Sequence, residues 1–76
     1  MERIREILVD TRPEYDFLNE VDFIEEGMLD SFDVITLVTE LEEIFNIQID
    51  GANIIPENFC SIKAIKELIL KSGGTI

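Results

Sequence analysis

The sequence has no histidine, no tryptophan, a single cysteine and only six basic residues among 76 positions. Without histidine or another base nearby, Ser31 cannot act as the nucleophile of a hydrolase. The single Cys60 excludes an internal disulfide and a zinc site built from several cysteines. No apolar run approaches the roughly 20 residues of a membrane-spanning helix, so we expect no membrane insertion. Glu2 and Arg3 follow Met1 in a helical pattern rather than a signal peptide, and we expect a cytoplasmic protein.

Charge is strongly one-sided, with 17 acidic residues against 6 basic ones and a net charge of −11. Phosphate contacts need lysine and arginine, so this balance argues against nucleic acid and against anionic membranes. An acidic surface attracts basic partner proteins and speeds encounter more than it tightens the complex. The plainer interpretation is that the acids keep a small protein soluble. The length predicts one domain over residues 1–76 with a small core, and we expect a monomer.

The hydrophobic pattern is helical throughout. Apolar residues recur at three- and four-residue spacing in three segments, and Pro56 suits the first position of a short helical turn. Gly73 and Gly74 end the last segment. The predicted fold is a small all-α bundle of three main helices plus one short helix, with a long first loop. The predicted helices cover residues 2–10, 30 or 31 to 46, and 62–70, with the short turn at 56–59.

The two longer connections carry apolar residues that have to pack against the core. In the first, at residues 11–30, Phe17-Leu18 favours a helical turn and Gly27 a positive φ. In the second, at residues 46–53, Ile47 and Ile49 are expected to insert into the core beside a turn at Asp50-Gly51.

Ser31 is the most informative residue, because it lies where the first connection becomes the second main helix. Serine and aspartate both cap helix N-termini well, so either Asp30 or Ser31 fits the cap. The helix dipole also favours an anion at this point. With no base beside it, Ser31 is either a helix cap or a hydroxyl that another enzyme modifies.

Three stretches of the sequence resemble the acyl and peptidyl carrier proteins. The segment Gly27-Met28-Leu29-Asp30-Ser31-Phe32-Asp33 resembles their attachment motif, in which leucine usually follows the serine. Residues 45–49 and 55–62 look like the family's end of helix two, its short helix and the start of its last helix. Phe32 is the one departure, and it is familiar from some carriers, including the D-alanyl group.

The resemblance implies a carrier rather than an enzyme. A phosphopantetheinyl transferase would move 4′-phosphopantetheine from coenzyme A onto Ser31, and the arm's thiol would hold acyl or aminoacyl cargo as a thioester. Asp30 would help to hold the metal and coenzyme at the transferase, although a capping role alone also accounts for it. Partners would be the transferase and the loading and downstream enzymes. Phe32 and residues 56–61 favour a specialised pathway of secondary-metabolite, aminoacyl or D-alanyl type.

The resemblance also makes the second main helix a docking surface for basic patches on those enzymes. The alternative is a solvated helix face, and for Phe32 a place in the core. The docking residues implied in this way are Phe32, Asp33, Thr36, Thr39, Glu40, Glu42 and Glu43.

Buried aliphatic residues have a second possible role, since cargo can enter the interior of such bundles. Simple core packing is the alternative for all of them. Cys60 lies between Phe59 and Ser61 and is expected to be a small buried hydrophobic residue rather than a thioester site. The residues that would line a cargo space are Leu37, Leu41, Ile54, Ile62 and Ile65.

Two other function classes compete with the carrier. An acidic helical adaptor would bind a basic partner without a prosthetic group. A calcium loop aligned on residues 22–33 places Gly27 correctly, but Ile24 stands where an oxygen ligand is needed, and Asp33 replaces the final glutamate. We therefore reject an EF-hand and expect no dedicated metal site, with weak divalent-cation binding left as an alternative.

Overall fold

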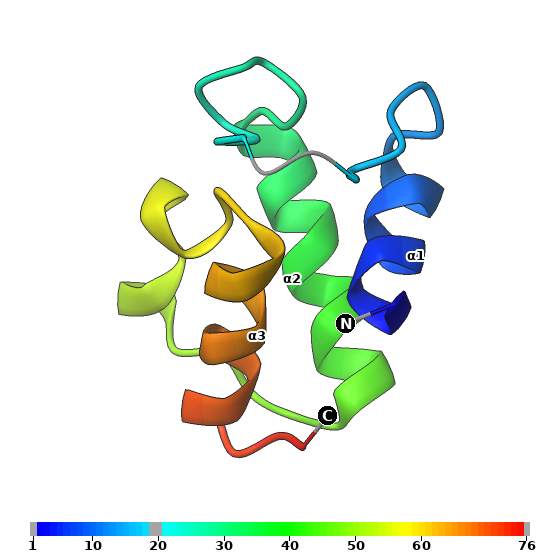
Figure 1. The fold of residues 1–76 in the computed structure, drawn as a ribbon. Coiled ribbons are helices and arrows are strands. Elements are labelled where there is room, and N and C mark those ends of the chain that lie inside the picture. The colour runs from blue at the N-terminus through cyan, green and yellow to red at the C-terminus, as the bar shows by residue number, and fades with distance from the viewer. Residues whose placement is uncertain (1, 19–20, 76) are drawn as a thin grey trace.

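The computed structural model describes residues 2–18 and 21–75, and it is helical with no strand in those ranges. The all-helical prediction is confirmed. The main helices are α1 (Glu2–Thr11), α2 (Ser31–Phe45) and α3 (Ile62–Lys71). Two single 3-10 turns, η1 (Gly51–Asn53) and η2 (Pro56–Asn58), connect α2 to α3 (Figure 1). The first connection also contains Asn19 and Glu20, which lie outside the described residues.

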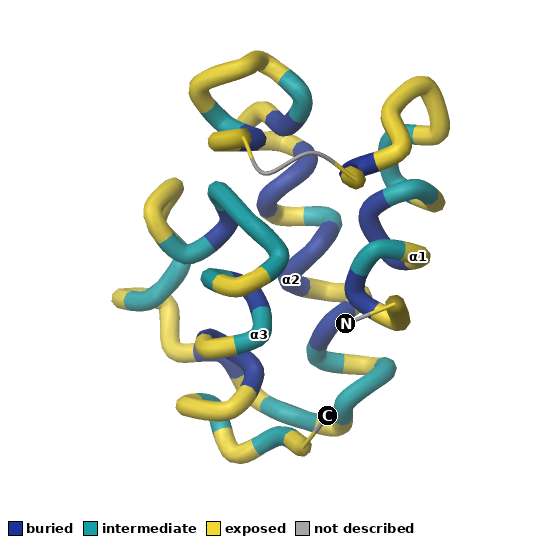
Figure 2. The backbone as a smooth tube through the Cα atoms, viewed as in Figure 1, coloured by how far each residue is buried: buried dark blue, intermediate teal, exposed yellow. Residues whose placement is uncertain are grey.

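Each main helix contributes one apolar stripe to a shared core, and Figure 2 shows the buried positions facing inward along α1, α2 and α3. This follows from the three- and four-residue spacing, which places the apolar side chains of a helix on one face. The polar faces of the helices point outward. The buried helical residues of the core are Ile4, Ile7, Leu8, Val34, Leu37, Val38, Leu41, Ile65, Leu68 and Ile69.

The first connection packs against this core through two aromatic rings. Phe17 and Phe23 are buried, and their centroids lie 5.0 Å apart in an edge-to-face arrangement. The helical turn predicted at Phe17-Leu18 is wrong, because Phe17 has a left-handed φ of 55°. The Asp16 carboxylate accepts the Leu18 N–H at 3.1 Å, so a side chain takes the place of a helical carbonyl acceptor. This local turn directs the Phe17 ring inward.

Residues that tolerate a left-handed backbone lie in the turn before α2 and at the ends of α2 and α3. Gly27 has the predicted positive φ of 76°, and Gly73 has a φ of 94° just after α3. Asn46, with a φ of 53°, ends α2. In the next connection Ile49 is buried, as predicted, and the Asp50 side chain accepts the Ala52 N–H at 2.9 Å to start η1.

Candidate functional site

Ser31 is the first residue of α2, and it is exposed at one end of the bundle (Figures 1 and 2). Asp30, not Ser31, is the N-cap. The Asp30 carboxylate accepts the Asp33 N–H at 2.9 Å, and the Asp33 carboxylate accepts the Asp30 N–H at 3.1 Å. This reciprocal pair is a capping box. Among the described residues, the Ser31 hydroxyl makes no hydrogen bond, so it is not needed to stabilise the helix end.

Ser61 shows what a capping serine looks like in the same chain. It precedes α3, and its hydroxyl oxygen accepts the Ala64 N–H at 3.0 Å. The two serines therefore have different local roles, although both stand at the start of a helix. The cap interpretation of Ser31 is excluded by the geometry of Asp30.

Arg12, in the turn after α1, contacts three carboxylates around this helix start. Its Nε donates to Asp33 Oδ2 at 2.7 Å, its Nη2 to Asp30 Oδ2 at 3.3 Å and its Nη1 to Glu14 Oε2 at 3.2 Å. Asp33 is only 6% exposed. The expectation that Asp33 belongs to the docking face is therefore wrong: as the third residue of the helix it closes the capping box beneath Arg12.

These contacts favour the ionised forms of Asp30 and Glu14. The pKa of Asp30 is lowered, first by the hydrogen bond from the Asp33 N–H and then by the nearby Arg12 charge, with partial desolvation opposing both. The pKa of Glu14 is also lowered, first by its own backbone N–H and then by Arg12. The pKa of Arg12 is raised, chiefly by its hydrogen bond to Asp33.

The outward face of α2 begins beside Ser31 with two apolar side chains. Phe32 is 75% exposed and Ile35 64% exposed, so the alternative that places Phe32 in the core is excluded. Sequence reasoning missed Ile35, although its position four residues after Ser31 places it on the same side of the helix. Further along this face lie Thr36, Thr39, Glu40 and Glu43, which are half-buried or exposed.

Glu42 has a structural role that the sequence did not reveal. It is half-buried, and its Oε2 accepts the Ile49 N–H at 2.9 Å. Its backbone carbonyl also accepts the Asn46 and Ile47 N–H groups. Glu42 therefore anchors the connection after α2, whereas the carboxylates of Glu40 and Glu43 form no hydrogen bond or ion pair with the described residues.

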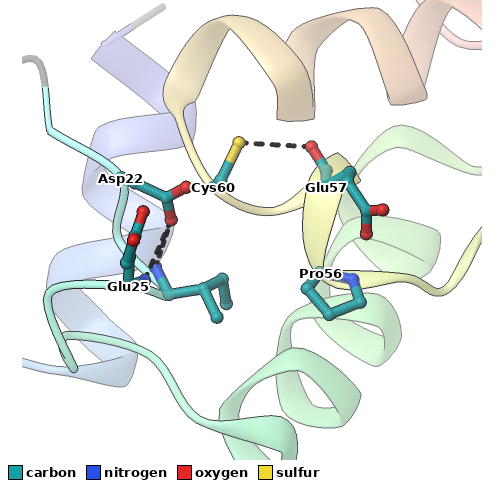
Figure 3. A pocket seen from close by; sticks show the side chains of 6 residues that line it. Asp22, Glu25, Pro56, Glu57 and Cys60 are labelled. Atoms are coloured by element: carbon teal, nitrogen blue, oxygen red, sulfur yellow. Dashed lines mark hydrogen bonds between the residues drawn. The ribbon is translucent and has the colours of Figure 1, made fainter.

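A hollow of about 290 Å³ lies between the turn at residues 22–25 and η2 (Figure 3). Cys60 lines it and is half-buried rather than buried as expected, because it lies beside η2 at the surface, where its Sγ–H donates to the Glu57 carbonyl at 3.2 Å. None of the five proposed cargo-lining residues borders this hollow, and Leu37, Leu41 and Ile65 are packed in the core. The residues around the hollow are Asp22, Ile24, Glu25, Pro56, Glu57 and Cys60.

Across the described ranges, no group of three or more cysteine, aspartate or glutamate side chains is placed to hold a metal ion. No helix in the same ranges is both long and apolar enough to cross a membrane.

The start of α2 fits a phosphodiester-linked group. Such a group needs an accessible hydroxyl, and the Ser31 hydroxyl is exposed. It makes no hydrogen bond to the described part of the chain, so its modification would break none. A helix N-terminus also favours the negative charge of the phosphate. Among the described residues, no side chain hydrogen-bonds the Ser31 hydroxyl, which suits a group that is added by another enzyme.

Comparison with known proteins assigns the family. A family model described as the phosphopantetheine attachment site matches residues 2–69, which include α1, α2 and most of α3. Searches of curated proteins and of solved structures gave no match. Family members are carriers rather than enzymes and bear 4′-phosphopantetheine covalently. This chain belongs to the phosphopantetheine attachment site family and is a carrier protein with a phosphopantetheine arm.

Proposed function

We propose that Ser31 is the residue that bears the arm, and that the chain acts as a carrier of acyl or aminoacyl intermediates. The observation that carries this proposal is the exposed Ser31 hydroxyl at the first position of α2, released from capping by Asp30. When attached, the group supplies a terminal thiol that holds the cargo as a thioester. The protein's own contribution is to present one hydroxyl on a rigid helix end.

Asp30 supports modification as well as the helix. It is exposed, directly precedes Ser31, and has a lowered pKa. An ionised carboxylate at this position is suited to contact the metal and coenzyme held by a transferase. Its second carboxylate oxygen contacts Arg12 at 3.3 Å, and the Asp30 side chain is 62% exposed, so a partner can still reach it.

The outward face of α2 is the proposed docking surface. It combines an apolar contact close to Ser31, made by Phe32 and Ile35, with free carboxylates further along the helix at Glu40 and Glu43. A partner that fits this face has an apolar patch beside basic side chains. The transferase and the enzymes that load and use the cargo are the expected partners.

The cargo is proposed to belong to a specialised pathway of secondary-metabolite, aminoacyl or D-alanyl type. Support comes from Phe32, whose exposed ring replaces the more usual leucine beside the serine. Loading the holo-carrier with an adenylating enzyme, D-alanine and ATP, in parallel with a malonyl transferase and malonyl-coenzyme A, separates the aminoacyl from the fatty-acid type. Acceptance of malonyl alone contradicts the D-alanyl and aminoacyl assignments.

Intact mass spectrometry tests the attachment site. After incubation with coenzyme A, Mg²⁺ and a broad-specificity phosphopantetheinyl transferase, the wild-type chain gains the mass of one phosphopantetheine. Ser31→Ala is expected to gain nothing, while Ser61→Ala gains the same mass as wild type and controls for loss of a helix-start serine. A wild-type chain that stays unmodified, or a modified Ser31→Ala, refutes the proposal.

Charge reversal tests the docking face. The double variant Glu40→Lys/Glu43→Lys should be modified more slowly than wild type at low salt and at a similar rate at high salt, because screening weakens exposed charges. The matched control is Glu2→Lys/Glu6→Lys, which changes the net charge equally on exposed positions of α1. Equal rates for both double variants would mean that the overall charge, not this face, matters.

A further inference from the structure

The helix start beside Ser31 is unusual in being closed by two carboxylates. A capping box normally pairs a neutral hydroxyl with glutamate or glutamine. Here Asp30 and Asp33 carry like charges, and each accepts the other's backbone N–H. Their mutual repulsion, together with the burial of Asp33, works against the arrangement unless a cation compensates it.

Arg12 supplies that cation in a form that bridges the pair. Its Nε contacts Asp33 Oδ2, the same oxygen that accepts the Asp30 N–H, and its Nη2 contacts Asp30 Oδ2, the oxygen that the capping box does not use. A guanidinium has its donors in a fixed planar fork, so the bridge also sets the relative position of the two carboxylates. Ser31 lies between these two residues in the chain.

The backbone around Arg12 is fixed as well. The Arg12 N–H donates to the Leu8 carbonyl at 2.9 Å, and the Arg12 carbonyl accepts the Tyr15 N–H at 3.2 Å. Pro13, with its fixed φ, lies between these two hydrogen bonds. The guanidinium therefore starts from a restrained turn at the end of α1, and this turn is held to the start of α2.

We propose that Arg12 is a positioning residue for phosphopantetheinylation: by bridging Asp30 and Asp33 it holds the first turn of α2 so that the Ser31 hydroxyl is presented in one orientation. This rests on the proposed attachment at Ser31. Arg12 touches neither the serine nor the coenzyme in this role and acts through the two carboxylates.

The test is the steady-state kinetics of modification, followed by intact mass with coenzyme A, Mg²⁺ and the transferase. Arg12→Ala should lower kcat by about tenfold or more with KM for coenzyme A unchanged, since a small misplacement of a reacting group can cost about a hundredfold. Arg12→Lys keeps the charge without the fork and should remain closer to Arg12→Ala than to wild type. Lys71→Ala is the control, because it removes one positive charge at the opposite end of the bundle from the start of α2 (Figure 1).

Hydrogen exchange supplies a second readout. In Arg12→Ala, the Asp33 and Val34 amides at the start of α2 should exchange faster, while amides of α3 keep their protection. If Arg12→Ala is unfolded at the assay temperature, Arg12→Lys carries the kinetic test.

The positioning role is overturned by an unchanged kcat in a folded variant, by a change confined to KM for coenzyme A, or by full rescue with lysine. A wild-type chain that is not modified at Ser31 refutes the attachment proposal instead. Normal modification of both wild type and Arg12→Ala refutes the Arg12 role alone.

Discussion

At the scale of single residues, the order of Asp30 and Ser31 gives the capping role to the aspartate and leaves the serine hydroxyl exposed. Asp30 stands at the N-cap and satisfies an N–H of the helix, which leaves the hydroxyl of Ser31 exposed one position later. With the order reversed, the serine would be drawn into capping, as Ser61 is before α3. A hydroxyl that is not used for capping stays accessible, which favours modification of a carrier by another enzyme.

Alanine substitution of the two serines should have unequal effects on stability. Ser61→Ala removes a cap and should lower the free energy of unfolding by about 1 kcal/mol. Ser31→Ala should change it by less than about 0.5 kcal/mol, as for an ordinary surface substitution. Urea denaturation followed by circular dichroism measures both. Equal losses would show that Ser31 also caps its helix.

The capping box should make stability depend on pH in acid. The folded-state pKa of Asp30 lies below the ordinary value of 3.8, so its carboxylate stabilises the fold above that pH and stops doing so as pH falls through the folded pKa. Asp30→Asn keeps a capping oxygen that does not titrate. The stability difference between wild type and this variant should be constant above about pH 5 and shrink below 3.8. A difference that persists unchanged in strong acid would contradict this assignment.

At the scale of elements, α2 combines three functions along one helix. Its first turn presents the candidate site, its inner face supplies Leu37 and Leu41 to the core, and its outer face stays exposed and is the proposed docking surface. Its last turn is fixed separately, because Glu42 accepts the Ile49 N–H and Asn46 adopts a left-handed backbone. The helix is therefore secured at both ends without using its outer face.

The end of α2 should be sensitive to the residue at position 46. Asn46 has a φ of 53°, which asparagine tolerates better than alanine and glycine tolerates best. Asn46→Ala should cost about 1 kcal/mol of unfolding free energy, whereas Asn46→Gly should be neutral or stabilising. Urea midpoints at a constant m-value report the difference. Equal stability of the alanine and glycine variants would argue against a left-handed cap.

At the scale of the whole molecule, charge is distributed unevenly as well as in excess. α2 carries acidic residues and no basic one, and the six basic residues lie on α1, on the following turn and on α3. A net charge of −11 on so small a protein opposes compactness through self-repulsion, while it attracts basic partners.

Sodium chloride should therefore stabilise the fold. The melting temperature should rise between low salt and about 1 M, where the Debye length is only about 3 Å. The Glu40→Lys/Glu43→Lys variant has fewer negative charges and should show a smaller rise. A melting temperature that falls with salt, or rises equally in both proteins, would mean that repulsion among the acidic residues contributes little to the stability of the fold.

Local patterns predicted most of the helices, and distant contacts account for what they missed. Helix periodicity, the positive φ of Gly27 and the Ser61 cap depend on near neighbours in the sequence, and these predictions are confirmed. The burial of Asp33 depends on Arg12, and the role of Glu42 depends on the Ile49 backbone, neither of which a helical pattern reveals.

Two other predictions, for Phe17 and Cys60, were wrong because of contacts that a helical pattern does not contain. Phe17 has a left-handed backbone in the turn closed by the Asp16 side chain, with its ring packed on Phe23, and Cys60 is half-buried because it lies beside η2 at the surface. At the candidate site, the resemblance indicated Ser31 and Asp30. The spacing from Ser31 could have indicated Ile35, while only three-dimensional placement revealed Arg12.

One backbone hydrogen bond, from the Phe23 N–H to the Cys60 carbonyl at 2.8 Å, has a consequence for folding kinetics. It joins the first connection to the residue just before the Ser61 cap of α3, so it cannot form until the chain has closed a long loop. The helices can form from local contacts much earlier. The turn that leads into Ser31 therefore acquires its native shape late. On the proposed attachment at Ser31, we expect a nascent chain to become a good transferase substrate only after the segment that contains Cys60 has packed against the first connection.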